Sequence, residues 1–100
     1  MIIINEMIFD WDEEKNQKNI IKHNIDFETA AHVFADNNRI EIYDEAHSDI
    51  DEDRYITIGQ LEDRVIVMVV YTDRNNNIRI ISARLATNKE KEMYYNVTRY

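Results

Sequence analysis

Two arginines lie inside an apolar stretch near the end of the chain, RIISARLATNKE at positions 79–90. A buried arginine loses its hydration, so it requires a carboxylate partner or an anionic ligand. In a regular strand Arg79 and Arg84 lie on opposite faces, about 17 Å apart along the strand. Both can line one cleft only if a bulge separates them or if Arg84 already belongs to the turn after the strand. Ion pairs with the many carboxylates of the chain explain the two arginines equally well.

A second basic group falls in a stretch that is expected to be helical. At 3.6 residues per turn, Lys15, Asn19 and Lys22 share one stripe, with His23 at its edge. A solvated basic face explains this stripe without any ligand, and a surface that binds an anion is the alternative. The three histidines, at positions 23, 32 and 47, share no metal-ligand spacing, so no metal site is predicted.

Other patterns that carry chemistry are absent or incomplete. The acidic run DIDED at 49–53 resembles half of a calcium-binding loop, but Arg54 replaces the required glycine and Gln60 replaces the bidentate glutamate. This run is therefore interpreted as a solvated acidic loop. The sequence has no G-x-S-x-G, no P-loop and no cysteine, which excludes disulfides and thiolate metal sites. No cofactor is predicted.

The charges are distributed unevenly along the 100 residues, whose formal net charge is −8. Residues 25–63 are strongly acidic, whereas residues 64–100 carry seven of the 12 lysines and arginines. This asymmetry fits an anionic ligand at a local patch, internal salt bridges, or a basic protein partner over the acidic segment.

Length and composition indicate a single domain, residues 1–100, that can bury its own core. Met7 offers an alternative start, so residues 1–6 are expected to be a short extension. No apolar run approaches the roughly 20 residues that span a bilayer, and the N-terminus lacks the basic segment of a signal peptide. We expect a cytoplasmic protein without a membrane partner.

Hydrophobic periodicity predicts an α+β fold with the element order β-α-α-β-β-β-β-α. A short strand at 7–11 precedes a helix at 13–23, which Asp12 caps and Asn24 ends in the left-handed conformation. Asp26 caps a second helix, whose apolar face is formed by Phe27, Ala30, Ala31 and Phe34.

The second half of the chain changes to the two-residue period of strands. Four strands with short connections predict an antiparallel sheet, with the helices packed on it, and they fall at 39–43, 55–59, 64–71 and 78–85. Thr87 and Glu90 have the spacing of a capping box, which begins a C-terminal helix.

Two long segments together resemble the BrnT family of toxins. FDWDEEKNQKNIIKHNIDFETA is similar to the family pattern F-x-W-D-x-x-K-x-x-x-N-x-x-K-H-G-V-x-F-x-x-A, and the matching residues are Phe9, Trp11, Asp12, Lys15, Asn19, Lys22, His23, Phe27 and Ala31. VVYTDRNNNIRIISARLATNKE is similar to Y-T-x-R-…-R-I-I-S-A-R-x-A-T-x-x-E. The resemblance runs from Phe9 to about Tyr95, and Asn24 stands where the family has glycine.

The resemblance implies a toxin of a bacterial type II toxin–antitoxin system with a RelE-like fold. Such toxins are small, metal-independent ribonucleases that inhibit translation. A BrnA-type antitoxin would neutralise the toxin, and their complex would repress its own promoter, with DNA contacted only through the antitoxin. The alternative is an inert module that keeps the fold and contacts the antitoxin without cutting RNA.

Metal-independent RNA cleavage uses the 2′-OH as nucleophile, with a base, an acid and cations that stabilise the phosphorane. His23 is the expected acid or base, because imidazole titrates near neutral pH. Arg79 and Arg84 are the other expected catalytic residues, because the guanidinium fork matches phosphate oxygens. The expected RNA-binding residues, including tyrosines that stack on unpaired bases, are Lys15, Lys22, Tyr71, Arg74 and Tyr95.

The acidic stretch 41–53 is expected to contact basic residues of the antitoxin, or to repel RNA from the wrong face. Charge reversal there is predicted to weaken the complex and to leave RNA cleavage by the free toxin intact.

Overall fold

The structure is a computed structural model that describes residues 1–48, 50 and 52–98. Six strands form one sheet in the order β1-β2-β6-β5-β4-β3. These strands are β1 (Ile2–Ile4), β2 (Met7–Trp11), β3 (Ile40–Tyr43), β4 (Arg54–Gln60), β5 (Ile66–Arg74) and β6 (Asn77–Leu85). The helices are α1 (Glu13–His23), α2 (Phe27–Ala31) and α3 (Asn88–Thr98), with the 3₁₀ turns η1 (His32–Ala35) and η2 (Glu62–Arg64).

The sheet is mixed, because β2 runs parallel to β6 while the other neighbouring strands are antiparallel. The α+β class and the antiparallel run from β3 to β6 are confirmed. The expectation of a wholly antiparallel sheet needs correction at β2. Two elements as far apart in sequence as β2 and β6 have no hairpin signal between them, so periodicity could not predict their pairing.

The first six residues form a hairpin with β2, which the sequence did not predict. β1 pairs with β2 in antiparallel register, and the turn residues Asn5 and Glu6 both have positive φ, 50° and 67°, as in the tight turns that favour hairpins. The Asn5 side-chain amide donates a hydrogen bond to the Phe34 carbonyl at 3.2 Å. Ile2 and Ile4 pack against the core, so this segment is an integral part of the sheet.

The predicted helix boundaries at the N-terminal helices are confirmed. An Asp12 carboxylate oxygen accepts a hydrogen bond from the Glu14 backbone N–H at 2.9 Å. Asn24 is left-handed, with φ 59° and ψ 31°, and its N–H donates to the Ile20 carbonyl. Asp26 likewise caps the second helix by accepting from the Thr29 backbone N–H at 2.7 Å.

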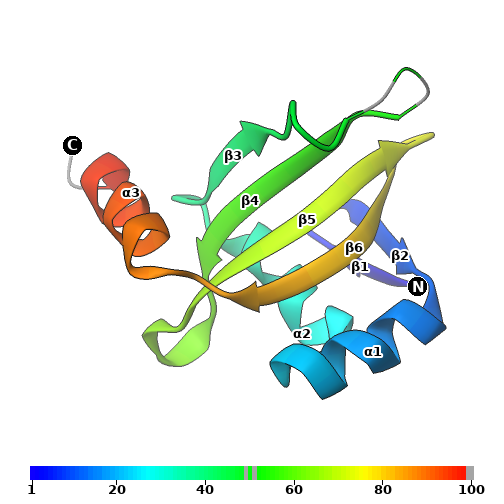
Figure 1. The fold of residues 1–100 in the computed structure, drawn as a ribbon, viewed down its shortest axis with the longest axis horizontal. Coiled ribbons are helices and arrows are strands. Elements are labelled where there is room, and N and C mark those ends of the chain that lie inside the picture. Colours follow the sequence, from blue (N-terminus) through cyan, green and yellow to red (C-terminus); the bar gives the residue numbers. More distant parts are fainter. Residues whose placement is uncertain (49, 51, 99–100) are drawn as a thin grey trace.

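The main core lies between the sheet and the segment formed by α2 and η1, which Figure 1 shows behind the strands. The predicted apolar face of this segment is fully buried, and its residues are Phe27, Ala30, Ala31 and Phe34. Gly59 of β4 permits the close approach of η1. A Cβ at this position would lie 3.1 Å from the Val33 Cβ and 3.2 Å from the Val33 carbonyl oxygen.

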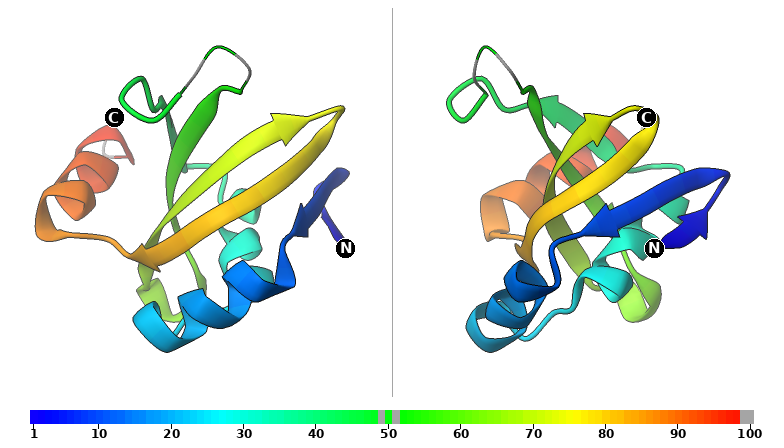
Figure 2. Two further views of the ribbon diagram at one scale, coloured as in Figure 1. Left: turned by 45° about the vertical axis from the view of Figure 1, so that its right-hand side comes forward. Right: turned by 90° about the vertical axis from the view of Figure 1, so that its right-hand side faces the viewer.

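The opposite face of the sheet is covered only at one end. There, α3 packs over a smaller core formed by Ile58, Ile66, Met68, Ala86 and Tyr94. Figure 2 shows α3 displaced toward one end of the strands, while α1 and α2 lie on the other side of the sheet. We call the remaining part of this side the uncovered face.

A bulge in β6 determines which side chains share the uncovered face. Val70 pairs with Ser82 and Tyr71 pairs with Ile80, so Ile81 is an extra residue without a partner on β5. Before the bulge, Ile78 and Ile80 face the main core, and after it Ala83 does so. The alternation therefore shifts by one residue within the strand.

Candidate functional site

The uncovered face carries four of the chain's seven arginines, namely Arg54, Arg74, Arg79 and Arg84. Cross-strand partners lie on the same face of a sheet. Arg79 pairs with Thr72 and Arg84 pairs with Met68. Thr72 and Met68 lie on the same side of β5. The bulge thus fulfils one of the two conditions under which both arginines could line one cleft.

Arg54 and Arg79 flank Thr72 in a row that crosses three strands. Two strand spacings place their Cα atoms about 10 Å apart. Thr72 is 1% exposed, and its hydroxyl donates to the Asp53 carbonyl at 2.8 Å, so the row has a fixed centre. Within the described residues the Arg54 side chain has no ion-pair partner. We call Arg54 and Arg79 the arginine pair.

Asp10 lies next to Arg79 on the adjacent strand β2. One Asp10 carboxylate oxygen is 3.5 Å from the Arg79 guanidinium, at the outer limit of a hydrogen bond. Both side chains are about one-third exposed, which leaves the guanidinium open to a second anion. The arginine pair with Asp10 therefore places two cations and one carboxylate around an accessible strand surface.

Arg84 is held by a carboxylate, as the ion-pair interpretation proposed. Its two terminal nitrogens donate to the two oxygens of Glu90 at 2.7 and 3.1 Å. Glu90 also accepts from the Thr87 backbone N–H at 2.8 Å, and the Thr87 hydroxyl accepts from the Glu90 N–H at 3.2 Å. The predicted capping box is confirmed, and it fixes Arg84 to the beginning of α3.

Burial of Glu90 raises its pKa, but the hydrogen bonds from Arg84 and Thr87 outweigh this effect and hold the pKa below its ordinary value. The carboxylate is therefore charged at neutral pH. A phosphate that binds Arg84 must either displace Glu90 or use the part of the guanidinium that Glu90 leaves accessible.

Arg74 is paired with Glu52 at the far end of the uncovered face. Its Nε and one terminal nitrogen lie 2.8 and 2.7 Å from a single Glu52 oxygen. The Arg74 side chain is half exposed, so salt and solvent weaken this pair. Arg74 is thus on the same face as the other predicted arginines, with a competing carboxylate.

His23 lies beside the end of β6 that carries Arg84. Asn19 replaces a strand partner at this edge, since its side-chain amide donates to the Ala83 carbonyl at 2.9 Å and accepts from the Ala83 N–H at 3.1 Å. From Asn19 to His23 the helix advances about 6 Å, and from Ala83 to Leu85 the strand advances about the same distance. Half-buried His23 is therefore level with Leu85. Figure 1 shows α1 following β6 in the same direction.

The stripe predicted on α1 needs one correction. Lys15 and Lys22 are exposed as expected, but Asn19 is buried, and the apolar Ile21 is 86% exposed. Asn16 shares the buried side and accepts a hydrogen bond from the Phe27 N–H at 2.8 Å. The helix therefore docks through asparagine amides rather than through an apolar stripe.

Tyr71 lies in the main core, on the side of the sheet opposite the arginine pair. Its ring stacks on Tyr55 at 5.6 Å and meets the Phe34 ring edge-on at 5.1 Å. Burial and the neighbouring Glu41 raise the pKa of Tyr71, whose hydroxyl donates to Glu41 at 3.3 Å. Both faces of the ring are covered by protein, so Tyr71 cannot stack on a base.

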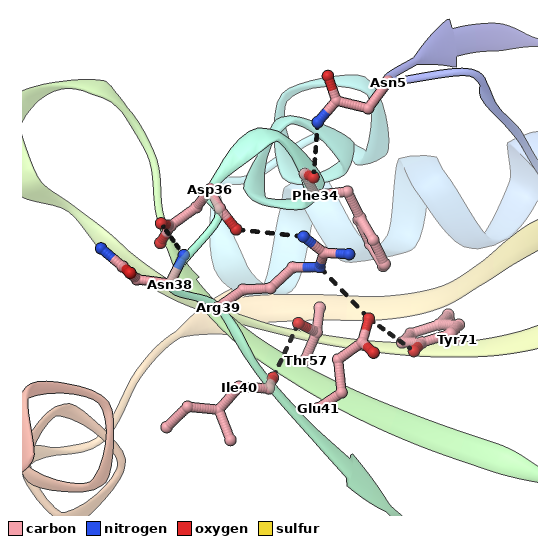
Figure 3. Close-up of polar contacts among 9 residues, drawn as sticks. All are labelled: Asn5, Phe34, Asp36, Asn38, Arg39, Ile40, Glu41, Thr57 and Tyr71. Carbon is pink, nitrogen blue, oxygen red and sulfur yellow. Dashed lines mark hydrogen bonds and ion pairs between the residues drawn. The ribbon is translucent and has the colours of Figure 1, made fainter. Parts of the chain in front are cut away.

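Figure 3 shows the network around Tyr71, which is structural. Arg39 donates to the Asp36 carbonyl at 3.2 Å and to Glu41 at 3.3 Å, and its guanidinium lies 5.6 Å from the centre of the Phe34 ring. The same Asp36 accepts from the Tyr94 hydroxyl at 2.6 Å through its side chain. These contacts connect η1, β3 and α3.

Tyr95, the other tyrosine predicted to stack on a base, lies beside Tyr94 on α3. Tyr94 is buried over the smaller core, and burial together with the Asp36 carboxylate raises its pKa. Tyr95 is 40% exposed, and its ring meets that of Tyr94 edge-on at 5.4 Å. Tyr95 is therefore the predicted stacking residue whose ring reaches the surface.

The structure adds Arg54 and Asp10 to the predicted residues. Arg54 lies two and four residues before Ile56 and Ile58, so strand alternation is the sequence signal that places it on their side of the sheet. Asp10 sits in a short strand whose pairing with β6 was not predicted, so nothing in the sequence connected it with Arg79. No described group of His, Cys, Asp and Glu residues is arranged to hold a metal ion, and no described helix is long and apolar enough to cross a membrane.

Comparison with known proteins identifies a family and a similar solved structure. Residues 11–90 match a family described as the ribonuclease toxin, BrnT, of type II toxin–antitoxin system. The fold is similar to the 1.1 Å crystal structure of the ribonuclease toxin BrnT from Brucella abortus, with a TM-score of 0.62 and 26% sequence identity. The alignment covers 82% of this chain and 99% of that one. No match was found among curated proteins.

Proposed function

Because this chain belongs to the BrnT family of ribonuclease toxins of type II toxin–antitoxin systems, we propose that it cuts RNA on the uncovered face of its sheet. The observation that supports this proposal most directly is the placement of Arg54, Arg79 and Arg84 on that one face. Guanidinium groups match phosphate oxygens, and RNA binding is dominated by phosphate contacts.

We assign the scissile phosphate to the arginine pair. In this metal-independent reaction the 2′-oxygen attacks the adjacent phosphorus and the bond to the 5′-oxygen breaks, which yields a 2′,3′-cyclic phosphate and a 5′-hydroxyl. Asp10 is the carboxylate beside Arg79, and it takes the proton of the 2′-hydroxyl. Arg54 and Arg79 stabilise the charge of the phosphorane, and the 5′-oxygen leaves with a proton drawn from water.

His23 and Arg84 both lie toward the other end of β6, His23 on α1 at the edge of the sheet and Arg84 on the uncovered face, and we assign each of them to RNA phosphates beyond the arginine pair. The sequence-based hypothesis placed acid–base chemistry on His23 itself. The two assignments differ in kinetics. If His23 is the acid or base, His23→Ala lowers kcat; if it only contacts a flanking phosphate, the variant raises KM and keeps kcat.

The predicted lysines fit a binding role at the edge of the site. Lys15 and Lys22 are exposed on α1, which runs beside β6, and they contact the phosphates of RNA that leaves the uncovered face. Arg74 joins the same surface when RNA phosphate competes with Glu52. Alanine at either lysine should weaken binding and reduce its salt dependence, with little effect on kcat.

A BrnA-type antitoxin is the proposed partner in the cytoplasm, where RNA cleavage inhibits translation. The complex represses its own promoter, and the antitoxin makes the DNA contacts, because the net charge of −8 opposes direct binding of this chain to DNA. A short neighbouring gene for a ribbon-helix-helix protein would support this arrangement.

The competing proposal is an inert module that binds the antitoxin only, which the overall acidity of the chain favours. Expression of the chain alone separates the two. An active toxin arrests growth and cuts RNA after purification, and an Arg79→Ala variant of unchanged thermal stability does neither. Normal growth together with intact RNA would instead identify the inert module.

A further inference from the structure

A small cavity lies where α3 meets the connection between β4 and β5, and of the residues discussed above as RNA contacts it includes Tyr95. Its volume is about 320 Å³, and it is lined by Arg64, Val65, Ile66, Leu85, Lys91 and Tyr95. Figure 1 shows α3 and this connection at the same end of the sheet. The volume lies at the lower end of the range for small-ligand sites, about 300–1,000 Å³, which suits a single small group rather than a folded partner.

The lining combines two cations with an aromatic ring. Arg64 and Lys91 are exposed, and within the described residues neither side chain makes an ion pair. Lys91 and Tyr95 are four residues apart on α3, so they lie on the same side of the helix. Cations near an exposed ring suit a nucleotide, since the phosphate binds the cations and the base stacks on the ring.

The backbone holds Arg64 in an unusual position. Arg64 has φ 64°, in the left-handed region that residues other than glycine rarely adopt. It ends the η2 turn and is followed directly by Val65 and Ile66, which also line the cavity. The turn therefore places the Arg64 backbone at the rim of the cavity.

The cavity lies on the side of the sheet that carries the uncovered face, at the end that α3 covers. Ile66, which lines it, lies on the same side of β5 as Met68 and Thr72, the partners of Arg84 and Arg79. Strand spacing places Ile66 about 7 Å beyond the Arg84 row and about 20 Å beyond the Arg79 row. Arg84 therefore lies between Arg79 and the cavity along the strands.

We propose that this cavity, here called the end pocket, binds one nucleotide of single-stranded RNA on the side of Arg84 away from Arg79, at a distance of a few nucleotides from the cleaved bond. The base stacks on Tyr95, and its phosphate lies between Arg64 and Lys91. The proposal rests on the proposed function, because it extends the same RNA path. It makes the toxin selective for unpaired RNA that is long enough to span the face.

Binding of RNA analogues that cannot be cleaved tests the end pocket. Labelled 2′-O-methyl oligonucleotides of about four to twelve nucleotides lack the attacking hydroxyl, and fluorescence anisotropy gives their affinities. We expect affinity to rise with length in the wild-type chain. Tyr95→Ala should lower the affinity for the longer oligonucleotides about tenfold, because one stacked base contributes about 1–3 kcal/mol. Tyr95→Phe keeps the ring and should restore it.

The contributions of Arg64 and Lys91 are measured from the salt dependence of RNA binding. Arg64→Ala and Lys91→Ala should each reduce the slope of log affinity against log salt for the long oligonucleotide by about 0.7, the value for one lost contact to a single strand. Lys89→Ala is the matched control, since it removes the same charge from the same helix outside the end pocket. Thermal unfolding confirms that the variants remain folded.

Two results would overturn the proposal. The first is that affinity rises with oligonucleotide length in the Tyr95, Arg64 and Lys91 variants as steeply as it does in the wild type. The second is a weaker complex with the antitoxin at unchanged RNA affinity, which would assign the end pocket to a protein partner. If the wild-type chain cleaves RNA in either case, the proposed function stands and the end pocket alone is rejected.

Discussion

Arg79 and Arg84 face the same side of the sheet because Ile81, between them, is an extra residue in β6. Without this bulge, strand alternation would turn Arg84 toward the main core. The same face holds Arg54 on the other side of Thr72. A single irregular residue therefore adds Arg84 to the side of the sheet that carries Arg54 and Arg79, the candidate RNA-cutting surface in this member of the BrnT family.

The ion pair between Arg84 and Glu90 should make stability depend on pH. The pKa of Glu90 is lowered in the folded chain, so the stabilisation is present above the unfolded value of about 4.5 and is lost as pH falls through the lower folded value. Arg84→Ala should lower the free energy of unfolding by about 1 kcal/mol at neutral pH and make it fall less steeply as the pH is lowered. Urea unfolding across this range measures both effects, with Glu90→Gln as a second variant. Parallel acid limbs in Arg84→Ala and wild type would disprove the assignment.

Asn24 should be replaceable by glycine with a gain in stability. Its φ of 59° and ψ of 31° are left-handed, and its capping hydrogen bond uses only the backbone N–H. Asn24→Gly should stabilise by up to about 0.5 kcal/mol, because glycine has no Cβ. Asn24→Ala should destabilise by about 1 kcal/mol, because alanine keeps the Cβ and lacks the short polar side chain that favours asparagine in the left-handed region. Thermal unfolding decides this, and the reverse order of the two variants would contradict the left-handed helix end.

Deletion of residues 1–6 should destabilise the chain rather than remove an inert extension. The deletion exposes the edge of β2, removes Ile2 and Ile4 from the core, and breaks the bond from Asn5 to the Phe34 carbonyl. We expect a loss of about 2 kcal/mol or more in the free energy of unfolding. Ile3→Ser is the control, since Ile3 is exposed and should change little. Equal stability of the truncated and full chains would show that β1 contributes nothing.

Charge reversal in the acidic stretch should weaken binding of the antitoxin. Glu45 is exposed in this stretch, whose positions 49 and 51 lie outside the described residues. Glu45→Lys should weaken the complex by about 1 kcal/mol or less, most clearly at low salt, and leave RNA cleavage unchanged. Calorimetric titration with the antitoxin measures this. An unchanged affinity at low salt would identify the stretch as a solvated loop.

Local signals in the sequence predicted the helix ends and the buried face of α2, because caps and periodicity act within a few residues. The bulge also has a signal in the sequence. The inward apolar positions 78, 80 and 83 are spaced by two and then three residues, which a regular strand does not produce. RIISAR also fits an unbroken strand, so the spacing of these three positions does not identify the bulge by itself.

Other features depend on partners that are distant in sequence. The pairing of β2 with β6 brings Asp10 to Arg79, and no local pattern encodes it. Asn19 was placed on a solvated stripe because asparagine is polar, yet it is buried where its amide satisfies the open edge of β6 at Ala83. Tyr71 was predicted to meet RNA, but its strand position turns it into the main core.

The most direct test of the uncovered face as the RNA-cutting site is single-turnover cleavage by Arg54→Ala and Arg79→Ala. Each variant should cleave RNA about 100-fold or more slowly than the wild type at saturating protein, because each removes a cation that stabilises the phosphorane. Lys89→Ala, which removes a charge from α3, is the matched control. Wild-type rates in both arginine variants would contradict the account and place the chemistry elsewhere in the molecule.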